Sequence, residues 1–523
     1  MLSLLALGLP GALVRVPPLL DYPNHLARLW LLAGGGAGGP LASIYGFDWT
    51  GAITNVGFDR LAAALGPLTG PDILPPVFLM LACVLPPAGA VLLNRTMFGG
   101  WHWWQCGFGL LAWSFTLLAG FLNFQLSLGL ALLGAAADPA FAGWRLGLFF
   151  RVAPFLRLAL GSLILICHPF GCLFYGVLIA ALGFGPERGI SWARLGRGFV
   201  AGGTACLIPL AIFWTWSPVW PGSHADGSMY LRWGGDALAS KLLVAASLVV
   251  TYDPLTDLTF LFALWFVLRI LIGIGRGRTH AGLLYAALTL AFLALVTPAA
   301  LANTAYVDIR LPLMAALLAA SALRPAARLP AATSAALLTA LVLARTAWID
   351  GVWDARQSDM RSLARALATV PAGARIVPTE HCCALGPIGR RLLVTTPTDL
   401  HDPALAIPWR QAFVPTLFAA PGKQPLRVLP PYKALAVLEG ATAPVRLLRE
   451  YISSPTNHFF FGYLEHWREQ FDYVLVVNAD TADDGPDEAN IPELQLVSDE
   501  GFARLYRITG LAHAAPGQVI TPR

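Results

Sequence analysis

The sequence predicts a polytopic α-helical membrane protein of about 11 transmembrane helices, followed by a C-terminal extracytoplasmic α/β domain. Composition and its distribution lead to this fold class. The 523 residues are 56% hydrophobic and only 12% charged, whereas soluble globular proteins carry about 25% charged residues. The deficit is uneven: residues 1–347 contain repeated apolar runs of membrane-spanning length, and charged residues return in residues 348–523.

Each apolar run in the first 347 residues is interpreted as one candidate span. The segment 236–252 is taken as interfacial, although it could form one more span. We expect the first span to be clipped at its cytoplasmic end, because Arg15 interrupts the run and no basic region precedes it. The runs lie near 1–20, 74–94, 103–119, 124–137, 146–163, 168–184, 198–217, 255–274, 281–298, 311–323 and 330–347.

Short arginine-rich loops set the expected orientation, because positively charged loops stay in the cytoplasm. With the N-terminus inside, all of these loops lie on the cytoplasmic face. The loops are 186–198, 275–280 and 324–328. The first extracytoplasmic loop, residues 21–72, then lies outside together with residues 348–523.

Residues 348–523 are predicted to form a small, soluble α/β domain. A helical pattern covers residues 355–371. Strand-like stretches follow at 374–379, 391–396, 471–479 and 502–508.

Polar residues gather at four junctions that this topology places on the outer face. Ionisable groups in or beside a span are costly, so they indicate a site by default. No comparable set is expected on the inner face. The residues are Asp21, Asn24, His25 and Arg28 after the first span, Asn123 and Gln125 in GFLNFQL, His168 in CHPFG, and Asp308 and Arg310 in YVDIRLP.

Each junction also has a structural alternative. Asp21 could cap the helix that follows it, and His168 could close a helical hairpin. Asn123 could form hydrogen bonds between helices, and Asp308 could pair with Arg310. The coincidence of all four junctions on one face favours a site.

The residue types at these junctions suit one kind of chemistry. A carboxylate at the membrane surface can act as a general base toward an acceptor hydroxyl. A guanidinium binds phosphate with planar, bidentate geometry. Together with apolar grooves between helices, these groups indicate transfer from a lipid-phosphate donor at the outer leaflet.

The stretch LLDYPNHLAR resembles the acidic motif of the GT-C class of integral membrane glycosyltransferases. The resemblance extends to bacterial relatives of protein O-mannosyltransferases and to lipid A aminoarabinose transferases. Those enzymes share a multi-span bundle, a long first extracytoplasmic loop with a catalytic acidic residue, and often a C-terminal periplasmic domain. The FLNFQL and CHPFG hairpins resemble the paired short spans of that class. YVDIRLP resembles its late outward loop, which contributes a basic residue to the donor phosphate.

The resemblance implies a GT-C-like catalytic domain in residues 1–347 of a multi-pass protein of the bacterial inner membrane, with residues 348–523 in the periplasm. It implies a polyprenyl-phosphate-linked sugar as donor and a glycan, lipid or protein hydroxyl as acceptor, with membrane lipids but no nucleic acid as partners. Asp21 would be the general base, and His25 would either support a metal or orient that base. Arg310, with Arg232 or Lys241, would stabilise the departing phosphate. The substrate-binding residues would be Asn24, Arg28, Asn123, His168, Asp308 and Arg310.

The first loop departs from the pattern of many relatives, which carry two acidic residues there. Tyr22 follows Asp21 directly, and the later carboxylates Asp48 and Asp59 are interpreted as turn or helix-cap residues. No cofactor is certain, and a divalent metal is only weakly supported, because a lone carboxylate is a poor site for a divalent cation.

Two other functions compete with this interpretation. One is a transporter or flippase of a lipid-linked sugar, for which Arg151 and Arg157 inside an apolar run are the best support. Transporters usually place ionisable groups near the bilayer midplane and show internal repeats, whereas the polar junctions here lie at one surface. The other is a non-catalytic membrane subunit of an envelope-glycan assembly.

Overall fold

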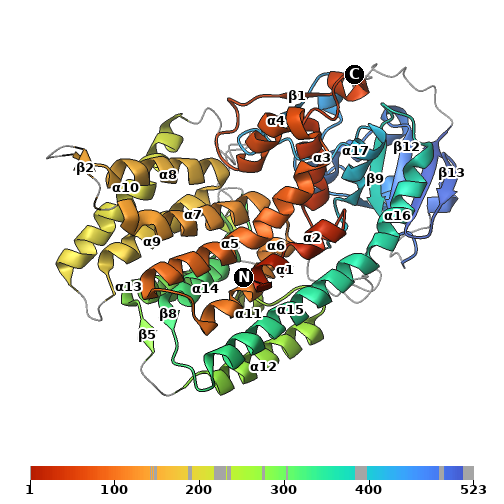
Figure 1. Cartoon of the computed structure of the whole chain (residues 1–523). Coiled ribbons are helices and arrows are strands. Elements are labelled where there is room, and N and C mark those ends of the chain that lie inside the picture. Colours follow the sequence, from red (N-terminus) through yellow and green to blue (C-terminus); the bar gives the residue numbers. More distant parts are fainter. Residues whose placement is uncertain are drawn as a thin grey trace. The chain divides into compact units, whose positions relative to one another are not determined.

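The computed structural model describes residues 2–141, 143, 145–146, 150–186, 191–216, 231–232, 237–273, 277–301, 304–382, 397–481 and 488–509. Most of these residues are helical (Figure 1). The contacts divide the chain into two compact units. The helical unit comprises Met1–Leu13, Gly51–Phe58 and Phe78–Asp350. The sheet unit comprises Val14–Thr50, Asp59–Val77 and Gly351–Arg523.

The helical unit contains the apolar helices of the chain together with short two-residue strands. The helices are α1 (Leu2–Ala6), α2 (Leu9–Leu13), α5 (Leu74–Phe98), the 3₁₀ helix η2 (Trp103–Ala112), α6 (Phe115–Leu118), α7 (Leu122–Phe141), α8 (Ala153–Cys167), α9 (Pro169–Phe184), α10 (Trp192–Trp216), α11 (Ala237–Ala246), α12 (Pro254–Leu271), α13 (Ala281–Val296), α14 (Arg310–Ala322) and α15 (Ala331–Ala355). The strands are β2 (Arg145–Leu146), β3 (Phe150–Arg151), β4 (Leu231–Arg232), β5 (Arg278–Thr279), β6 (Ala300–Leu301), β7 (Thr304–Ala305) and β8 (Leu323–Arg324).

Within the described residues, five helices are long and apolar enough to cross a membrane. They are α5, α7, α10, α12 and the stretch Ala331–Thr369 that begins with α15. Shorter apolar helices accompany them at Leu2–Leu13, Ala153–Cys167, Pro169–Phe184, Ala281–Val296 and Arg310–Ala322. Helix α12 exposes large apolar side chains such as Phe262, Trp265 and Phe266, as expected of a membrane-facing surface. The predicted helical membrane character is therefore confirmed.

Small residues bring helices of this unit into close contact. A Cβ atom on Gly161 of α8 would lie 1.8 Å from the backbone oxygen of Ala205 in α10. A Cβ atom on Gly202 of α10 would lie 2.6 Å from the backbone oxygen of Gly176 in α9. Contacts of this kind let helices associate in a membrane, where the hydrophobic effect does not drive them together.

Two of the expected spans differ from single α-helices. The run 103–119 forms η2 and the short helix α6. A 3₁₀ helix as long as η2 is uncommon. The run 1–20 forms α1 and α2 and then leaves the helical state after Leu13.

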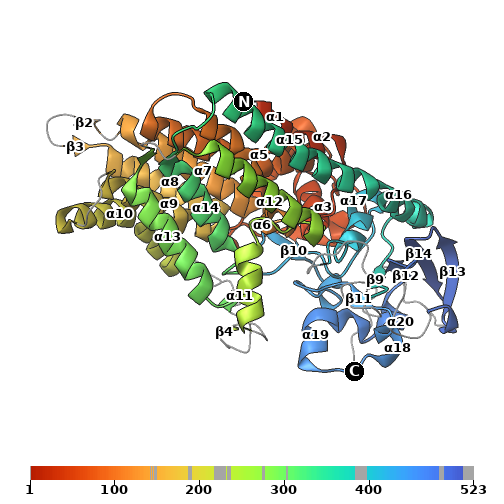
Figure 2. The same ribbon diagram turned by 90° about the horizontal axis from the view of Figure 1, so that it is seen from below.

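The sheet unit contains, in its described part, a five-stranded sheet of order β11-β9-β12-β14-β13 (Figure 2). Strands β11, β9 and β12 are parallel, while β14 pairs antiparallel with both β12 and β13. The strands of this sheet are β9 (Ile376–Glu380), β11 (Ala443–Pro444), β12 (Tyr473–Val477), β13 (Leu494–Asp499) and β14 (Ala503–Ile508). The strands expected at 374–379, 471–479 and 502–508 are confirmed, and the one expected at 391–396 lies outside the described residues.

Helices and 3₁₀ turns surround this sheet. They are α3 (Tyr22–Leu32), η1 (Pro40–Ser43), α4 (Gly57–Thr69), α16 (Gln357–Ala366), η3 (Leu367–Thr369), η5 (Asp402–Leu405), α17 (Ala406–Arg410), η6 (Tyr432–Ala434), α18 (Leu447–Glu450), α19 (Pro455–Phe461), η7 (Gly462–Leu464), α20 (Trp467–Gln470) and η8 (Glu488–Asn490). Helix α16 packs against β14.

Most of the first loop folds with the C-terminal part of the chain inside the sheet unit. Strand β1 (Tyr45–Phe47) pairs antiparallel with β10 (Leu426–Val428). Helix α3 lies beside α17 and contacts η5 (Figures 1 and 2). The sheet unit thus differs from the expected domain 348–523 by including residues 14–50 and 59–77.

Candidate functional site

Asp21 lies at the start of α3 in the sheet unit. Pro23 favours a helix start here, because its fixed φ suits the first helical turn. Asp21 occupies the N-cap position, but within this described segment its side chain makes no capping hydrogen bond. The carboxylate keeps 19% of its surface exposed. The capping role considered for Asp21 is therefore not observed, and its side chain is partly exposed.

The ring of His401 lies beside Asp21, with 3.8 Å between Nε2 of His401 and Oδ1 of Asp21. The ring packs edge-on against Phe418, at a centroid distance of 4.9 Å. Burial lowers the pKa of His401 to about 3, so the ring is neutral near pH 7. Its Nδ1 atom has no hydrogen-bond partner among the described residues. The arrangement is a carboxylate beside a neutral imidazole.

Arg28 is buried one turn after His25 and forms an ion pair with Asp59. Its Nε donates to Asp59 Oδ1 over 2.6 Å, and the two side chains are 1% and 0% exposed. Its Nη2 donates to His25 Nδ1 over 3.0 Å. A neutral His25 therefore carries its proton on Nε2, since a guanidinium can only donate. Arg28 thus orients His25 and neutralises Asp59, a role that the expected substrate contact did not include.

Asn24 and His25 both contact Phe418. The side-chain oxygen of Asn24 accepts a hydrogen bond from the Phe418 amide over 3.1 Å. The buried Nδ2 group of Asn24 has no hydrogen-bond partner in the described part of the chain. The His25 ring meets the Phe418 ring edge-on at 6.5 Å. Phe418 therefore packs against both histidine rings near Asp21.

Sequence reasoning missed three features of this region: the residues His401 and Phe418, and the ion pair of Asp59 with Arg28. The signal for His401 was weak, a His–Asp pair within the apolar stretch LHDPALAIP. Its neighbour Asp402 is also buried, and burial, followed by the charge of Asp399, raises the pKa of the Asp402 carboxyl well above its usual value. Phe418 carried no signal, because an aromatic residue in PTLFAAPG is typical of a core.

The other three junctions converge within the helical unit around aromatic rings. The guanidinium of Arg310 lies over the rings of Phe121, Phe124 and Phe170, at 4.4, 5.9 and 5.3 Å from their centroids. The His168 ring contacts Phe124 and Phe170 at 5.5 and 5.8 Å. We call Phe121, Phe124 and Phe170 the aromatic cage. The segments GFLNFQL, CHPFG and YVDIRLP therefore meet at this cage.

Arg310 and Asp308 have different partners. Nη1 of Arg310 donates to the backbone oxygens of Ala305 and Tyr306, each over 2.7 Å. Asp308 accepts a hydrogen bond from Nζ of Lys241 on α11 over 2.6 Å, and its Oδ1 accepts the Ile309 amide. The pairing of Asp308 with Lys241 adds a second cation to this part of the helical unit.

Asn123 and His168 form local hydrogen bonds. Asn123 Oδ1 accepts the Phe58 amide over 2.9 Å, and its Nδ2 donates to Asn55 over 2.8 Å. Asn123 therefore anchors residues 55–58 to α7, rather than joining two membrane helices. His168 is the N-cap of α9, where its Nδ1 accepts the Phe170 amide over 3.2 Å. The hairpin role considered for His168 is thus present, together with its contact to the aromatic cage.

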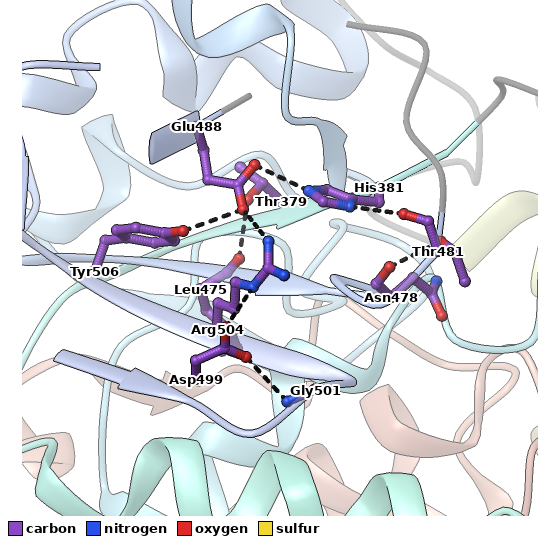
Figure 3. Close-up of polar contacts among 10 residues, drawn as sticks. All are labelled: Thr379, His381, Leu475, Asn478, Thr481, Glu488, Asp499, Gly501, Arg504 and Tyr506. Atoms are coloured by element: carbon purple, nitrogen blue, oxygen red, sulfur yellow. Dashed lines mark hydrogen bonds and ion pairs between the residues drawn. The ribbon is translucent and has the colours of Figure 1, made fainter. Parts of the chain in front are cut away.

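A second polar cluster lies in the sheet unit around the buried carboxylate of Glu488 (Figure 3). It accepts hydrogen bonds from His381 Nε2, Arg504 Nη1 and Tyr506 Oη over 2.9, 3.0 and 3.1 Å. The other ring nitrogen of His381 faces the Thr481 carbonyl at 3.0 Å. Both nitrogens of His381 face acceptors, so the doubly protonated ring satisfies both. This cluster ties β9, β14 and η8 together.

The side chain of Arg232, which the resemblance assigned to the departing phosphate, lies outside the described part of the structure. Within the described ranges, no group of three or more His, Cys, Asp or Glu side chains could hold a metal ion.

Comparisons with protein-family models, curated proteins and solved structures find no match. The class of this protein therefore follows from its architecture: a mostly helical chain with helices able to cross a membrane and a C-terminal sheet.

Proposed function

We propose that the chain is an integral membrane glycosyltransferase that moves a sugar from a polyprenyl-phosphate-linked donor to an acceptor hydroxyl. The observation that carries this proposal is the Asp21 carboxylate. It is accessible, takes no part in capping α3 and lies beside a neutral imidazole. The resemblance of LLDYPNHLAR to the GT-C acidic motif supports the same function.

In the proposed reaction, Asp21 removes the proton from the acceptor hydroxyl. The acceptor oxygen then forms a bond to the anomeric carbon of the donor sugar, while the bond from that carbon to the phosphate oxygen breaks. The electron pair leaves with the lipid phosphate, and the configuration at the anomeric carbon is inverted. A neutral His401 suits this step, because a cation beside Asp21 would make the carboxylate a weaker base.

The departing phosphate requires nearby positive charge. In this proposal, Arg310 and Lys241 of the helical unit supply it, and the aromatic cage provides apolar surface for the first part of the lipid chain. Asp21 belongs to the sheet unit and Arg310 to the helical unit.

We also propose that the protein resides in the bacterial inner membrane with about 11 spans and with its sheet unit in the periplasm. In the described part of the chain, the five long and five shorter apolar helices would supply ten of these spans. The arginine-rich loops support the orientation through the positive-inside rule.

Replacing Asp21 with asparagine tests the central step. Asp21→Asn keeps the size of the side chain but removes its basicity, so we expect the rate to fall by about 10²–10⁴-fold. The measurement is the release of free polyprenyl phosphate by the purified full-length protein, given a panel of polyprenyl-phosphate-linked hexoses and aminosugars. Asp48→Asn, in the same loop region, is the matched control and should keep its rate. Release by Asp21→Asn at the wild-type rate would reject the general-base role.

Transport of a lipid-linked sugar is the second candidate function. A cavity of about 670 Å³ in the helical unit is lined by Asp138, Arg157, Arg278 and His280. Arg157 forms a bidentate ion pair with Asp138, over 2.7 and 2.8 Å. Sugar transfer in detergent solution distinguishes the two functions, because a transferase works without two separated compartments and a transporter does not.

A further inference from the structure

A second cavity, of about 830 Å³, lies within the sheet unit. This volume falls in the range of about 300–1,000 Å³ that is typical of ligand sites. Its walls come from the end of α3, the residues after α4, the α15–α16 region and α17. The polar and aromatic residues that matter for its chemistry are Trp30, Trp409, Arg15, Asp72, Asp354 and Arg361.

One wall of the cavity is a single helical face with unpaired charges. The lining positions 354, 357, 361, 364 and 368 are spaced by three or four residues, which places them on one side of a helix. Asp354 and Arg361 are both exposed. Nε of Arg361 donates to the Gln357 carbonyl over 3.2 Å, and no hydrogen bond to its terminal amino groups or to Asp354 occurs among the described residues. The wall therefore offers both free donors and free acceptors.

The remaining walls add a loose ion pair and two indole rings. Arg15 and Asp72 lie 3.9 Å apart with 74% and 68% of their side chains exposed. Trp409 is half-buried, and Trp30 is buried against Gly35, where an added Cβ would lie 2.3 Å from the ring. Trp409 thus supplies a partly exposed ring, and Trp30 supplies a buried ring that is tightly packed against Gly35.

The lining excludes several ligand classes. The charged walls, which carry Arg15, Arg361 and Arg410 as well as Asp72 and Asp354, do not suit a lipid tail. No strand contributes to the lining, so a peptide could not add to a sheet edge there. Sugar rings fit, because each hydroxyl donates to a carboxylate and accepts from a guanidinium, while the apolar face of the ring packs on an indole.

We propose that this cavity is a saccharide-binding site and that the saccharide is the acceptor. The second part rests on the transferase proposed above. Trp30 follows Asp21 by nine positions on α3, which corresponds to about 14 Å along a helix. An acceptor glycan of a few sugar units held at the cavity would be long enough to cover that distance.

The test uses the purified full-length protein and an array of immobilised neutral and acidic oligosaccharides. We expect the wild type to bind a subset of the array. Trp409→Ala and Arg361→Ala should each weaken that binding at least tenfold. The matched controls are Trp192→Ala and Arg197→Ala, both exposed on α10, and they should bind as the wild type does.

Failure to bind any oligosaccharide, or unchanged binding by both cavity variants, contradicts the proposal. Asp21→Asn separates this outcome from failure of the transferase. It should keep saccharide binding while losing transfer. Transfer retained by Asp21→Asn would contradict the proposed transferase mechanism but not the proposed saccharide-binding site. If Asp21→Asn loses transfer but no protein binds any saccharide, the transferase proposal is supported and the saccharide-binding proposal is contradicted. The acceptor would then belong to another chemical class.

Discussion

The guanidinium of Arg28 has a partner that its place in the sequence does not indicate. Its position beside Asp21 and His25 suggested a substrate contact, yet its ion-pair partner is Asp59, 31 positions further along the chain. Both side chains are buried. Breaking a buried pair by removing one partner leaves an uncompensated charge, which usually costs about 3–5 kcal/mol.

We expect Arg28→Ala to lower the free energy of unfolding by about 3–5 kcal/mol. Chemical denaturation of the full-length protein measures this change. The exposed pair of Arg365 and Glu500 in the same unit is the control, and Arg365→Ala should cost no more than about 1 kcal/mol. An Arg28→Ala protein of normal stability but reduced activity would instead show that Arg28 binds substrate.

Among the structural elements, β9, β14 and η8 show how a buried carboxylate can hold secondary structure together. Burial of Glu488 opposes its ionisation, but hydrogen bonds from His381, its own backbone amide and Arg504 outweigh burial and lower its pKa from 4.5 to about 2. Because the folded pKa lies below the ordinary value, the stabilisation is complete above about pH 4.5. It is lost as the pH falls toward 2.

Replacing Glu488 with glutamine should therefore change how stability depends on pH. A shift of this size corresponds to about 3 kcal/mol, so Glu488→Gln should lower the unfolding temperature at pH 7. Between pH 4.5 and 2.5 the wild type should lose stability more steeply than the variant. Thermal unfolding of the full-length protein across this range measures both effects. Glu450→Gln, at an exposed position of α18, should behave as the wild type, and identical pH profiles for all three proteins would contradict the role of Glu488.

At the scale of the whole molecule, the proposed orientation places the sheet unit and the arginine-rich loops on opposite sides of the membrane. Single cysteines at Glu450 and Arg328 test this in a background whose native cysteines are replaced. Both positions are exposed. We expect Glu450→Cys to react with a membrane-impermeant maleimide on intact cells, and Arg328→Cys to react only after permeabilisation. The reverse labelling pattern would show the opposite orientation. Labelling of both cysteines on intact cells would contradict the proposal that they lie on opposite sides of the membrane.

Two features of this protein follow from its sequence alone. The apolar runs predict membrane helices because hydropathy is a local property, and five of the resulting helices are long enough to cross a membrane in the described part of the chain. The apolar stretches IVPTE and YVLVV predict buried strands for the same reason, and β9 and β12 are buried at every position.

Only the tertiary structure decided what surrounds Asp21. Asn24 and Phe418 are separated by 394 positions, and His401 reaches Asp21 only because α3 packs against η5 and α17. Contacts over such distances depend on how separate elements pack, and no local pattern of hydrophobicity or charge encodes them. Contact between α3 and α4 likewise gave Arg28 a buried partner in Asp59. The sequence therefore singled out the carboxylate, whereas only the fold determined its neighbours.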